Sequence, residues 1–164
     1  MQRTLATSPP TMPLTVVDDL CVLTNDIVRD IDAVAHATLT VVRRGEQWAA
    51  FSTDRIAEVL NEIEQNVGGP ALDALWSGGI ARISSTLRPS RWPEYTQECK
   101  RRRVGSVVAF PISVVDARVG AITVASHDYY AFGPEQMQTG LAAATRAAEI
   151  LASAYSFRID NHIA

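Results

Sequence analysis

The most prominent apolar pattern in the chain is a pair of runs rich in β-branched residues. The first run covers residues 104–115, the second covers residues 119–126, and Asp116, Ala117 and Arg118 join them. Two such runs around a short polar link predict an antiparallel hairpin. Because successive positions are apolar in both runs, we expect both faces of the resulting sheet to be covered.

Patterns on either side of this hairpin predict the remaining elements. Strands are expected over residues 35–42, 47–52 and 80–83. Helices are expected over residues 14–31, 55–65, 70–76, 94–103 and 133–157. Helices at both ends of the chain, with a mainly antiparallel sheet of about five to six strands between them, predict an α+β domain.

The predicted elements form a single domain over residues 14–157. The chain has 164 residues, which is enough to bury one sizeable core. Pro9, Pro10 and Pro13 mark residues 1–13 as a short disordered segment. Residues 158–164 are expected to form a C-terminal tail.

Composition and charge narrow the class of protein. A net charge of −3 gives no bulk attraction to nucleic acid or anionic membranes. No segment approaches the roughly 20 apolar residues of a membrane span, and the N-terminus lacks the apolar centre of a signal peptide. Cys21 and Cys99 are the only cysteines, too few for a disulfide framework. We therefore expect a cytoplasmic protein with reduced thiols and no membrane association.

Four short segments, in this order, resemble the GAF domain family. They are residues 69–75 (GPALDAL), 88–95 (RPSRWPEY), 104–112 (VGSVVAFPI) and 119–124 (VGAITV). The resemblance covers roughly residues 14–154 and is closest to the bacterial GAF domains that often precede an RNA-binding ANTAR domain. It implies a regulatory module with the first and last helices on one sheet face. On the other face it implies a small-molecule pocket, roofed by the segment between the short strand and the hairpin.

Two departures from this subfamily affect what the resemblance implies. Ala71 stands where the subfamily usually has a cysteine, so a thiol-based role is not expected at that position. The chain ends at Ala164, soon after the last expected helix, so we expect a stand-alone GAF domain without an ANTAR output domain. Signal output would then require a separate partner protein.

Aromatic residues are the first candidates for the pocket. Trp76, Trp92, Tyr95 and Phe110 lie in or beside the segments that would roof it. Aromatic side chains with a polar group suit an apolar ligand cavity. The alternative is that they fill the core beneath a closed roof.

Polar candidates flank the same roof. Arg82, Arg88 and Arg91 are placed to hold an anionic ligand group, although unpaired arginines are usually solvated. Thr123, in the second run of the hairpin, completes the set of pocket candidates.

The first and last helices carry heptad-like apolar stripes. The resemblance implies that such terminal helices pair two protomers, so we expect a homodimer. The candidate interface residues are Val17, Cys21, Val28, Met137, Leu141, Ala144, Ala148 and Leu151.

Other functions have less support in the sequence. The basic run at residues 100–103 matches what a helix C-terminus favours, so nucleic-acid binding is not expected. Haem binding through His36 or His127, known in some GAF domains, and a metal site are not expected either, and we predict no cofactor. No catalytic motif is present, and Cys21 and Cys99 do not reproduce the active site of free methionine sulfoxide reductases.

These observations favour a non-catalytic sensor domain that binds a small molecule and acts through a partner. The alternative is a dimeric scaffold whose pocket is filled by its own side chains. A reductase of free methionine sulfoxide is the remote alternative.

Overall fold

A computed structural model describes residues 4–7 and 12–162, with side chains described as far as Ala154. Six strands form one sheet in the order β1-β3-β2-β6-β5-β4, and every neighbouring pair is antiparallel. The strands are β1 (Leu5–Thr7), β2 (His36–Arg43), β3 (Glu46–Ser52), β4 (Ala81–Ile83), β5 (Ser106–Val114) and β6 (Ala117–Ser126). The predicted hairpin, formed by β5 and β6, lies near the middle of the sheet.

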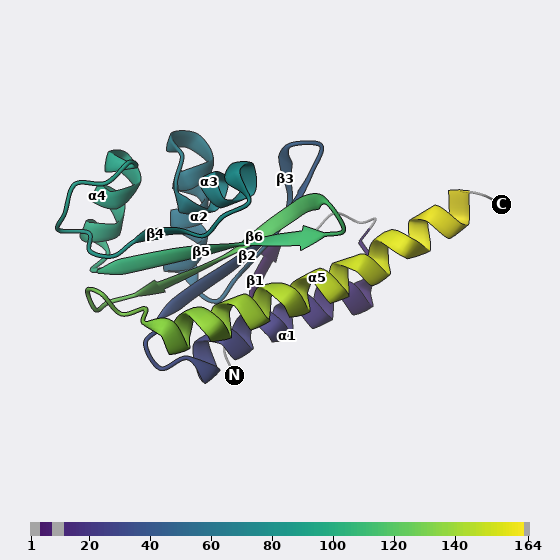
Figure 1. Cartoon of the computed structure of the whole chain (residues 1–164), viewed down its shortest axis with the longest axis horizontal. Coiled ribbons are helices and arrows are strands. Elements are labelled where there is room, and N and C mark those ends of the chain that lie inside the picture. The colour runs from purple at the N-terminus through teal and green to yellow at the C-terminus, as the bar shows by residue number, and fades with distance from the viewer. Residues whose placement is uncertain (1–3, 8–11, 163–164) are drawn as a thin grey trace.

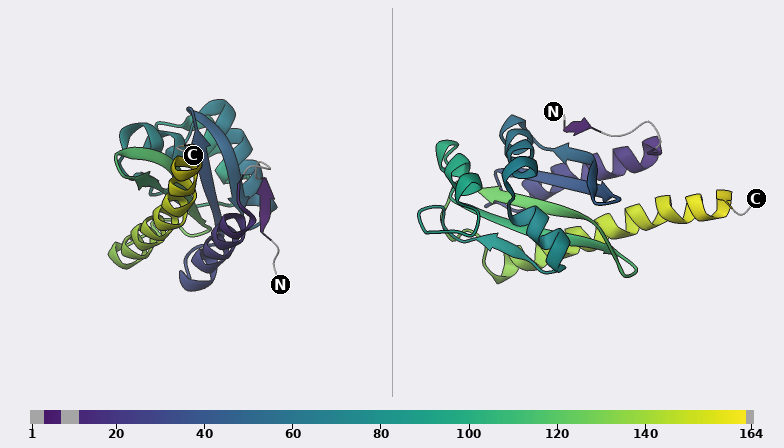
Figure 2. Two further views of the ribbon diagram at one scale, coloured as in Figure 1. Left: turned by 90° about the vertical axis from the view of Figure 1, so that its right-hand side faces the viewer. Right: turned by 90° about the horizontal axis from the view of Figure 1, so that it is seen from above.

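Helices cover both faces of this sheet (Figure 1). They are α1 (Leu14–Asp30), α2 (Arg55–Val67), α3 (Pro70–Ser77), α4 (Pro93–Arg101) and α5 (Pro134–His162). α1 and α5 pack side by side on one face, whereas α2, α3 and α4 lie on the other (Figures 1 and 2). The predicted α+β class is therefore confirmed, with both terminal helices on the same side of the sheet.

The two faces of the sheet carry side chains of different size. Large apolar side chains pack beneath α1 and α5: Leu39, Val41, Phe51, Val108, Phe110, Ile112 and Ile122. Facing α2–α4 are small or hydroxyl-bearing side chains: Thr38, Thr40, Ser52, Ala109, Ala121, Thr123 and Ala125. Bulky side chains also pack on this side, at Leu60, Ile83, Tyr95 and Val107, but the small side chains beside them leave space for a site beneath α2–α4.

Small residues on α5 let this helix approach the sheet closely. A Cβ atom at Gly140 would overlap the ring of Phe110 on β5. Ala143, Ala144 and Ala147 are likewise buried in the core between α5 and the sheet. The alanine-rich sequence of α5 is thus explained in part by packing within the same chain.

The ends of the chain differ from the prediction. β1 lies within the segment expected to be disordered, and it pairs with β3 as an edge strand; residues 1–3 and 8–11 lie outside the described part. α5 continues to His162, into the expected tail, and residues 163–164 lie outside the description as well. Within the described ranges, no helix is long and apolar enough to cross a membrane.

Candidate functional site

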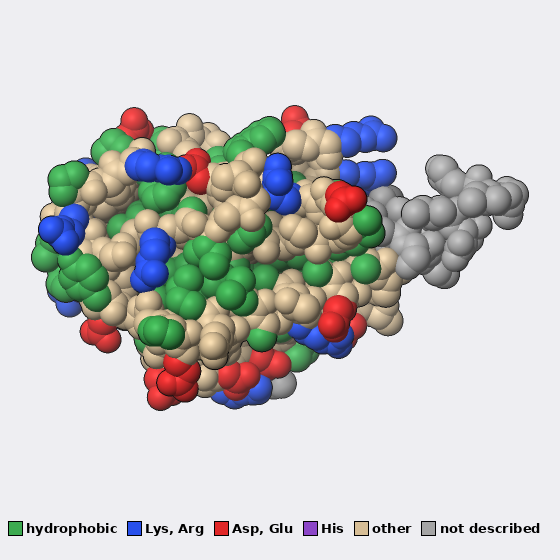
Figure 3. All heavy atoms as spheres, in the orientation of Figure 1, with side chains coloured by type: hydrophobic (Ala, Val, Ile, Leu, Met, Phe, Trp, Pro, Cys, Tyr) green, Lys and Arg blue, Asp and Glu red, His purple; other side chains and the backbone are tan. Residues whose placement is uncertain are grey.

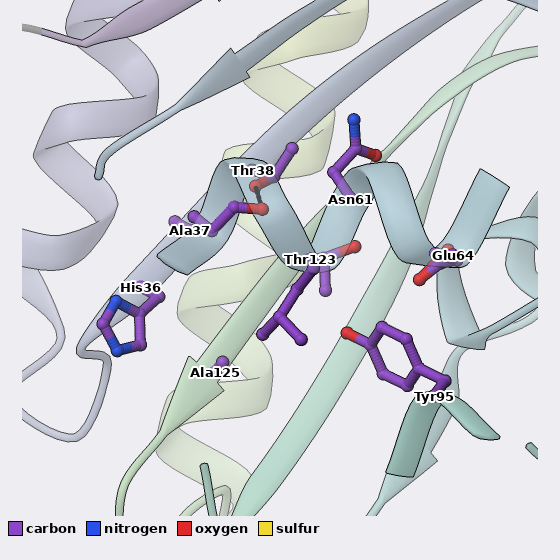
Figure 4. A pocket seen from close by; sticks show the side chains of 10 residues that line it. His36, Ala37, Thr38, Asn61, Glu64, Tyr95, Thr123 and Ala125 are labelled. Atoms are coloured by element: carbon purple, nitrogen blue, oxygen red, sulfur yellow. Dashed lines mark hydrogen bonds between the residues drawn. The ribbon is translucent and has the colours of Figure 1, made fainter. Parts of the chain in front are cut away.

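A small, partly open cavity lies between the sheet and helices α2 and α4 (Figure 4). Its floor consists of Thr38 on β2 with Thr123 and Ala125 on β6, and its walls include Glu64 and Tyr95. In Figure 4, Tyr95 extends from α4 with its hydroxyl toward the labelled strand residues. The cavity volume is about 20 Å³, room for about one water molecule.

Asp54 fixes the start of α2 above one end of this cavity. Its Oδ1 accepts a hydrogen bond from the Ala57 amide at 2.9 Å, which caps the helix. Its Oδ2 lies 2.6 Å from Nδ1 of His36 on β2. Burial opposes ionisation of Asp54, but the bonds from His36 and the Ala57 amide outweigh it, so the pKa of Asp54 is lowered.

His36 lines the cavity and has one ring nitrogen without a partner. Nε2 is buried and makes no hydrogen bond to the described residues. The ring meets the ring of His127 edge to face, with centroids 5.0 Å apart. In the described part of the chain, no group of three or more His, Cys, Asp or Glu is placed to hold a metal ion.

Glu64 supplies a buried carboxyl group to the same cavity. Its Oε2 accepts a hydrogen bond from the Leu72 amide at 3.2 Å, in the first turn of α3. Burial raises the pKa of Glu64 to about 7. Glu64 thereby caps α3, because the N-cap residue of this helix, Gly69, has no side chain to do so. Gly69 also makes room for Glu64, since a Cβ at this position would lie only 2.5 Å from Cγ of Glu64.

The two cysteines lie on opposite sides of the sheet. Cys99 and Tyr95 lie on the buried side of α4, whereas Cys21 on α1 packs against the core on the other face. Burial raises the pKa of Cys99 to about 12 and that of Tyr95 well above its usual value. A thiol with such a pKa remains protonated near neutral pH, which makes it a weak nucleophile.

A second hollow lies outside the cavity, between α3, β4 and the loop that leads into α4. It is an open groove of about 570 Å³. Three arginines line it, Arg82, Arg88 and Arg91, together with the ring of Trp92 and the carboxylate of Asp73. The groove therefore carries more positive than negative charge.

The structure divides the predicted pocket residues between these places. Tyr95 and Thr123 line the small cavity, and the groove contains Arg82, Arg88, Arg91 and Trp92. Trp76 is 72% exposed and lines neither hollow. Phe110 lies on the opposite face of the sheet, beneath α5. The prediction of one site formed by all of these residues was therefore too broad.

Eight of the ten residues that line the cavity were not among the predicted pocket residues, including His36, Thr38 and Glu64. Thr38 and Thr40 alternate with Leu39 and Val41 along β2, and this period of two separates a polar from an apolar face. That alternation was the available signal. For Glu64 the sequence contained no such signal, because an acid on an amphipathic helix is usually solvated.

The structure also separates the expected interface residues. Ala144 and Leu151 are buried in the core of the protomer and do not reach the surface. Five are partly buried against this core: Val17, Cys21, Val28, Met137 and Ala148. Leu141 is the exposed member of the set, at 46%.

The basic run at the end of α4 is partly neutralised by an acidic neighbour. Arg101 and Arg102 each lie 2.7 Å from a carboxylate oxygen of Glu98. Hydrogen bonds from Arg102 and the charges of both arginines lower the pKa of Glu98. Elsewhere, on the face shown in Figure 3, Lys and Arg are dispersed among acidic and uncharged groups.

Comparison with known proteins identifies the fold. No protein-family model matches the sequence, and no curated protein matches it. Among solved structures, the GAF domain region of a Geobacter sulfurreducens protein is similar, with 16% identity and a TM-score of 0.70 over 84% of this chain and 93% of that chain. The GAF domain of a two-component sensor histidine kinase from Bacillus halodurans has 10% identity and a TM-score of 0.59, covering 84% and 97%.

A third similar structure is an enzyme. The type II free methionine-R-sulfoxide reductase from Thermoplasma acidophilum has 14% identity and a TM-score of 0.69, over 86% of this chain and 95% of that chain. At these identities the similarity establishes the fold alone. The chain thus has the fold of GAF domains, in which both sensory domains and an enzyme occur.

Proposed function

We propose that this chain is a non-catalytic sensor domain that binds a small molecule between its sheet and helices α2 and α4. The observation that carries the proposal is the difference between the two sheet faces. Bulky apolar side chains fill one face, whereas threonines, alanines, a buried acid and a tyrosine surround a cavity on the other. Such a mixture of small and hydrogen-bonding groups is typical of ligand sites. The sensor kinase among the similar structures supports a role in signalling.

The four sequence segments add support for a closer relation to the GAF domains that precede ANTAR domains. They build the elements around the site: residues 69–75 form most of α3, residues 88–95 lead into α4, and residues 104–112 and 119–124 form most of the hairpin. Output through a separate partner protein is part of this proposal.

A volume of about 20 Å³ is too small for a metabolite. Binding therefore requires α4 and the loop before it to move away from the sheet. The same volume favours a second candidate function, a dimeric scaffold whose pocket is closed by its own side chains.

Thr123 provides the test of the sensor proposal. In a thermal-shift screen of amino acids, nucleotides and aromatic acids, a ligand at 100 times its dissociation constant adds about 2.7 kcal/mol of stability. We expect Thr123→Val to weaken binding of a hit about fivefold, because it removes one hydroxyl from the cavity floor and keeps the side-chain shape. The measurement is the dissociation constant by calorimetry.

Thr40→Val is the matched control, because Thr40 lies on the same sheet face but does not line the cavity. Equal affinities for the Thr123 and Thr40 variants would contradict the proposed site. If no compound in the screen raises the melting temperature, the scaffold function is favoured.

We further propose that the outer sides of α1 and α5 pair two protomers. Leu141 on α5 and Val22 on α1 are large, apolar and exposed, and helices of this kind associate through such residues. Leu141→Asp is expected to convert a dimer into a monomer of 17.8 kDa in sedimentation, because association would bury an unpaired charge. Leu87→Asp, at an exposed loop position, should leave the dimer intact. If the unmodified protein sediments as a monomer, the proposed interface is contradicted.

The reductase alternative has less support. Catalysis by a thiol requires access and a thiolate, whereas Cys99 is buried with a raised pKa and Cys21 lies on the other side of the sheet. These features favour a non-catalytic role.

A further inference from the structure

The open groove, here called the arginine groove, concentrates positive charge on a protein of net charge −3. It is lined by Arg82 on β4, Arg88 and Arg91 in the following loop, and Asp73 on α3. Three cations and one carboxylate leave two positive charges uncompensated among the lining residues. This local excess is opposite in sign to the charge of the whole chain.

Hydrogen bonds to the loop before α5 hold two of these arginines in place. Nη2 of Arg82 donates to the carbonyl of Phe132 at 2.9 Å, and Nη1 of Arg88 donates to the hydroxyl of Tyr130 at 3.3 Å. A guanidinium has five N–H donors in a planar fork, so these bonds leave most donors free. The loop thus holds both guanidinium groups in place and leaves most of their N–H donors available to a ligand.

The third arginine is held differently. Arg91 forms an ion pair with Asp73, and its guanidinium carbon lies 5.0 Å from the centre of the Trp92 ring. Its charge is therefore balanced within the groove, and Arg82 and Arg88 supply the excess. Ser84 and Ser85 also line the wall.

We propose that the arginine groove binds a small molecule bearing two or more phosphate or carboxylate groups. The guanidinium fork matches the paired oxygens of either group, and two uncompensated charges call for a dianion or higher. A volume of about 570 Å³ suits a metabolite. The groove does not include the small cavity between the sheet and helices α2 and α4, so this inference does not rest on the proposed sensor function.

The test is calorimetric titration with pyrophosphate and, separately, with citrate at low ionic strength. We expect saturable binding of at least one, weakened about tenfold or more in Arg88→Gln, because an exposed charge-assisted pair is lost. Binding of pyrophosphate alone would indicate a phosphate-bearing ligand, and binding of citrate alone would indicate a carboxylate-bearing ligand. Binding of both would indicate that the groove recognises either kind of anion. Arg55→Gln, at an exposed arginine on α2 outside the groove, is the control and should bind like the unmodified protein.

Three results would overturn the proposal. They are no saturable binding of either anion, equal weakening in the Arg55 and Arg88 variants, or Arg88-dependent binding of an RNA oligonucleotide when both small anions fail. Equal melting temperatures for the two variants would show that any difference arises in binding and not in folding.

Discussion

Replacing Phe110 with alanine is expected to lower the free energy of unfolding by about 3–5 kcal/mol. The ring is fully buried between the sheet and α5, and it lies directly against the backbone of α5 at Gly140. Removing it leaves a cavity that the close-packed helix cannot fill without moving. Urea unfolding of the two proteins gives the difference directly.

Trp76→Ala is the matched control, since both aromatic residues were candidates for the ligand pocket. Trp76 is largely exposed, so its replacement is expected to change stability by less than about 0.5 kcal/mol. A larger loss for Trp76 than for Phe110 would contradict the assignment of Phe110 to the core beneath the terminal helices.

Glu64 is expected to make stability fall as the pH rises from about 4.5 to about 7. Its pKa is about 7 in the folded protein, because of burial, against an ordinary value of 4.5. Between these values the folded state holds a proton that the unfolded state has released, so raising the pH favours unfolding. This difference in pKa corresponds to about 3 kcal/mol of stability. That contribution is fully lost once the pH exceeds the pKa of Glu64 in the folded protein.

The comparison with Glu64→Gln isolates this effect. Between pH 4 and pH 8 the unmodified protein should lose about 3 kcal/mol of stability relative to the variant, which has no carboxyl group at this position. Urea unfolding at each pH measures this difference. Asp54, whose lowered pKa acts in the opposite sense, is present in both proteins and cancels. Glu62→Gln, at an exposed position on the same helix, controls for the loss of a charge. A stability difference for Glu64→Gln that does not vary with pH would refute the assignment.

The sheet and its covering helices could be predicted because their signals are local. The continuous β-branched runs of β5 and β6, and the apolar stripes of α1 and α2 at helical spacing, are each visible within the element's own sequence. β1 had no such signal, since all three of its residues are exposed at the edge of the sheet. A short exposed strand is formed by pairing with its neighbour and not by a pattern in its own sequence.

The site was harder to predict because it depends on which face each strand residue occupies. Phe110 and Ala109 are neighbours in the sequence, yet they lie on opposite faces of β5. Where successive residues are all apolar, the pattern does not say which of them lies beneath α5. Arg82 and Arg91 were predicted to flank the roof of the pocket from their places in the sequence. That they line a groove separate from the cavity of Tyr95 follows from tertiary packing alone.

The central claim is that a small molecule binds over the threonine-bearing face of the sheet. Amide chemical-shift mapping by NMR, with the compound that gives the largest thermal shift, tests it most directly. We expect the largest changes at Thr38, Thr123 and Tyr95, on either side of the small cavity. Changes confined to α1 and α5, or to the arginine groove, would contradict it.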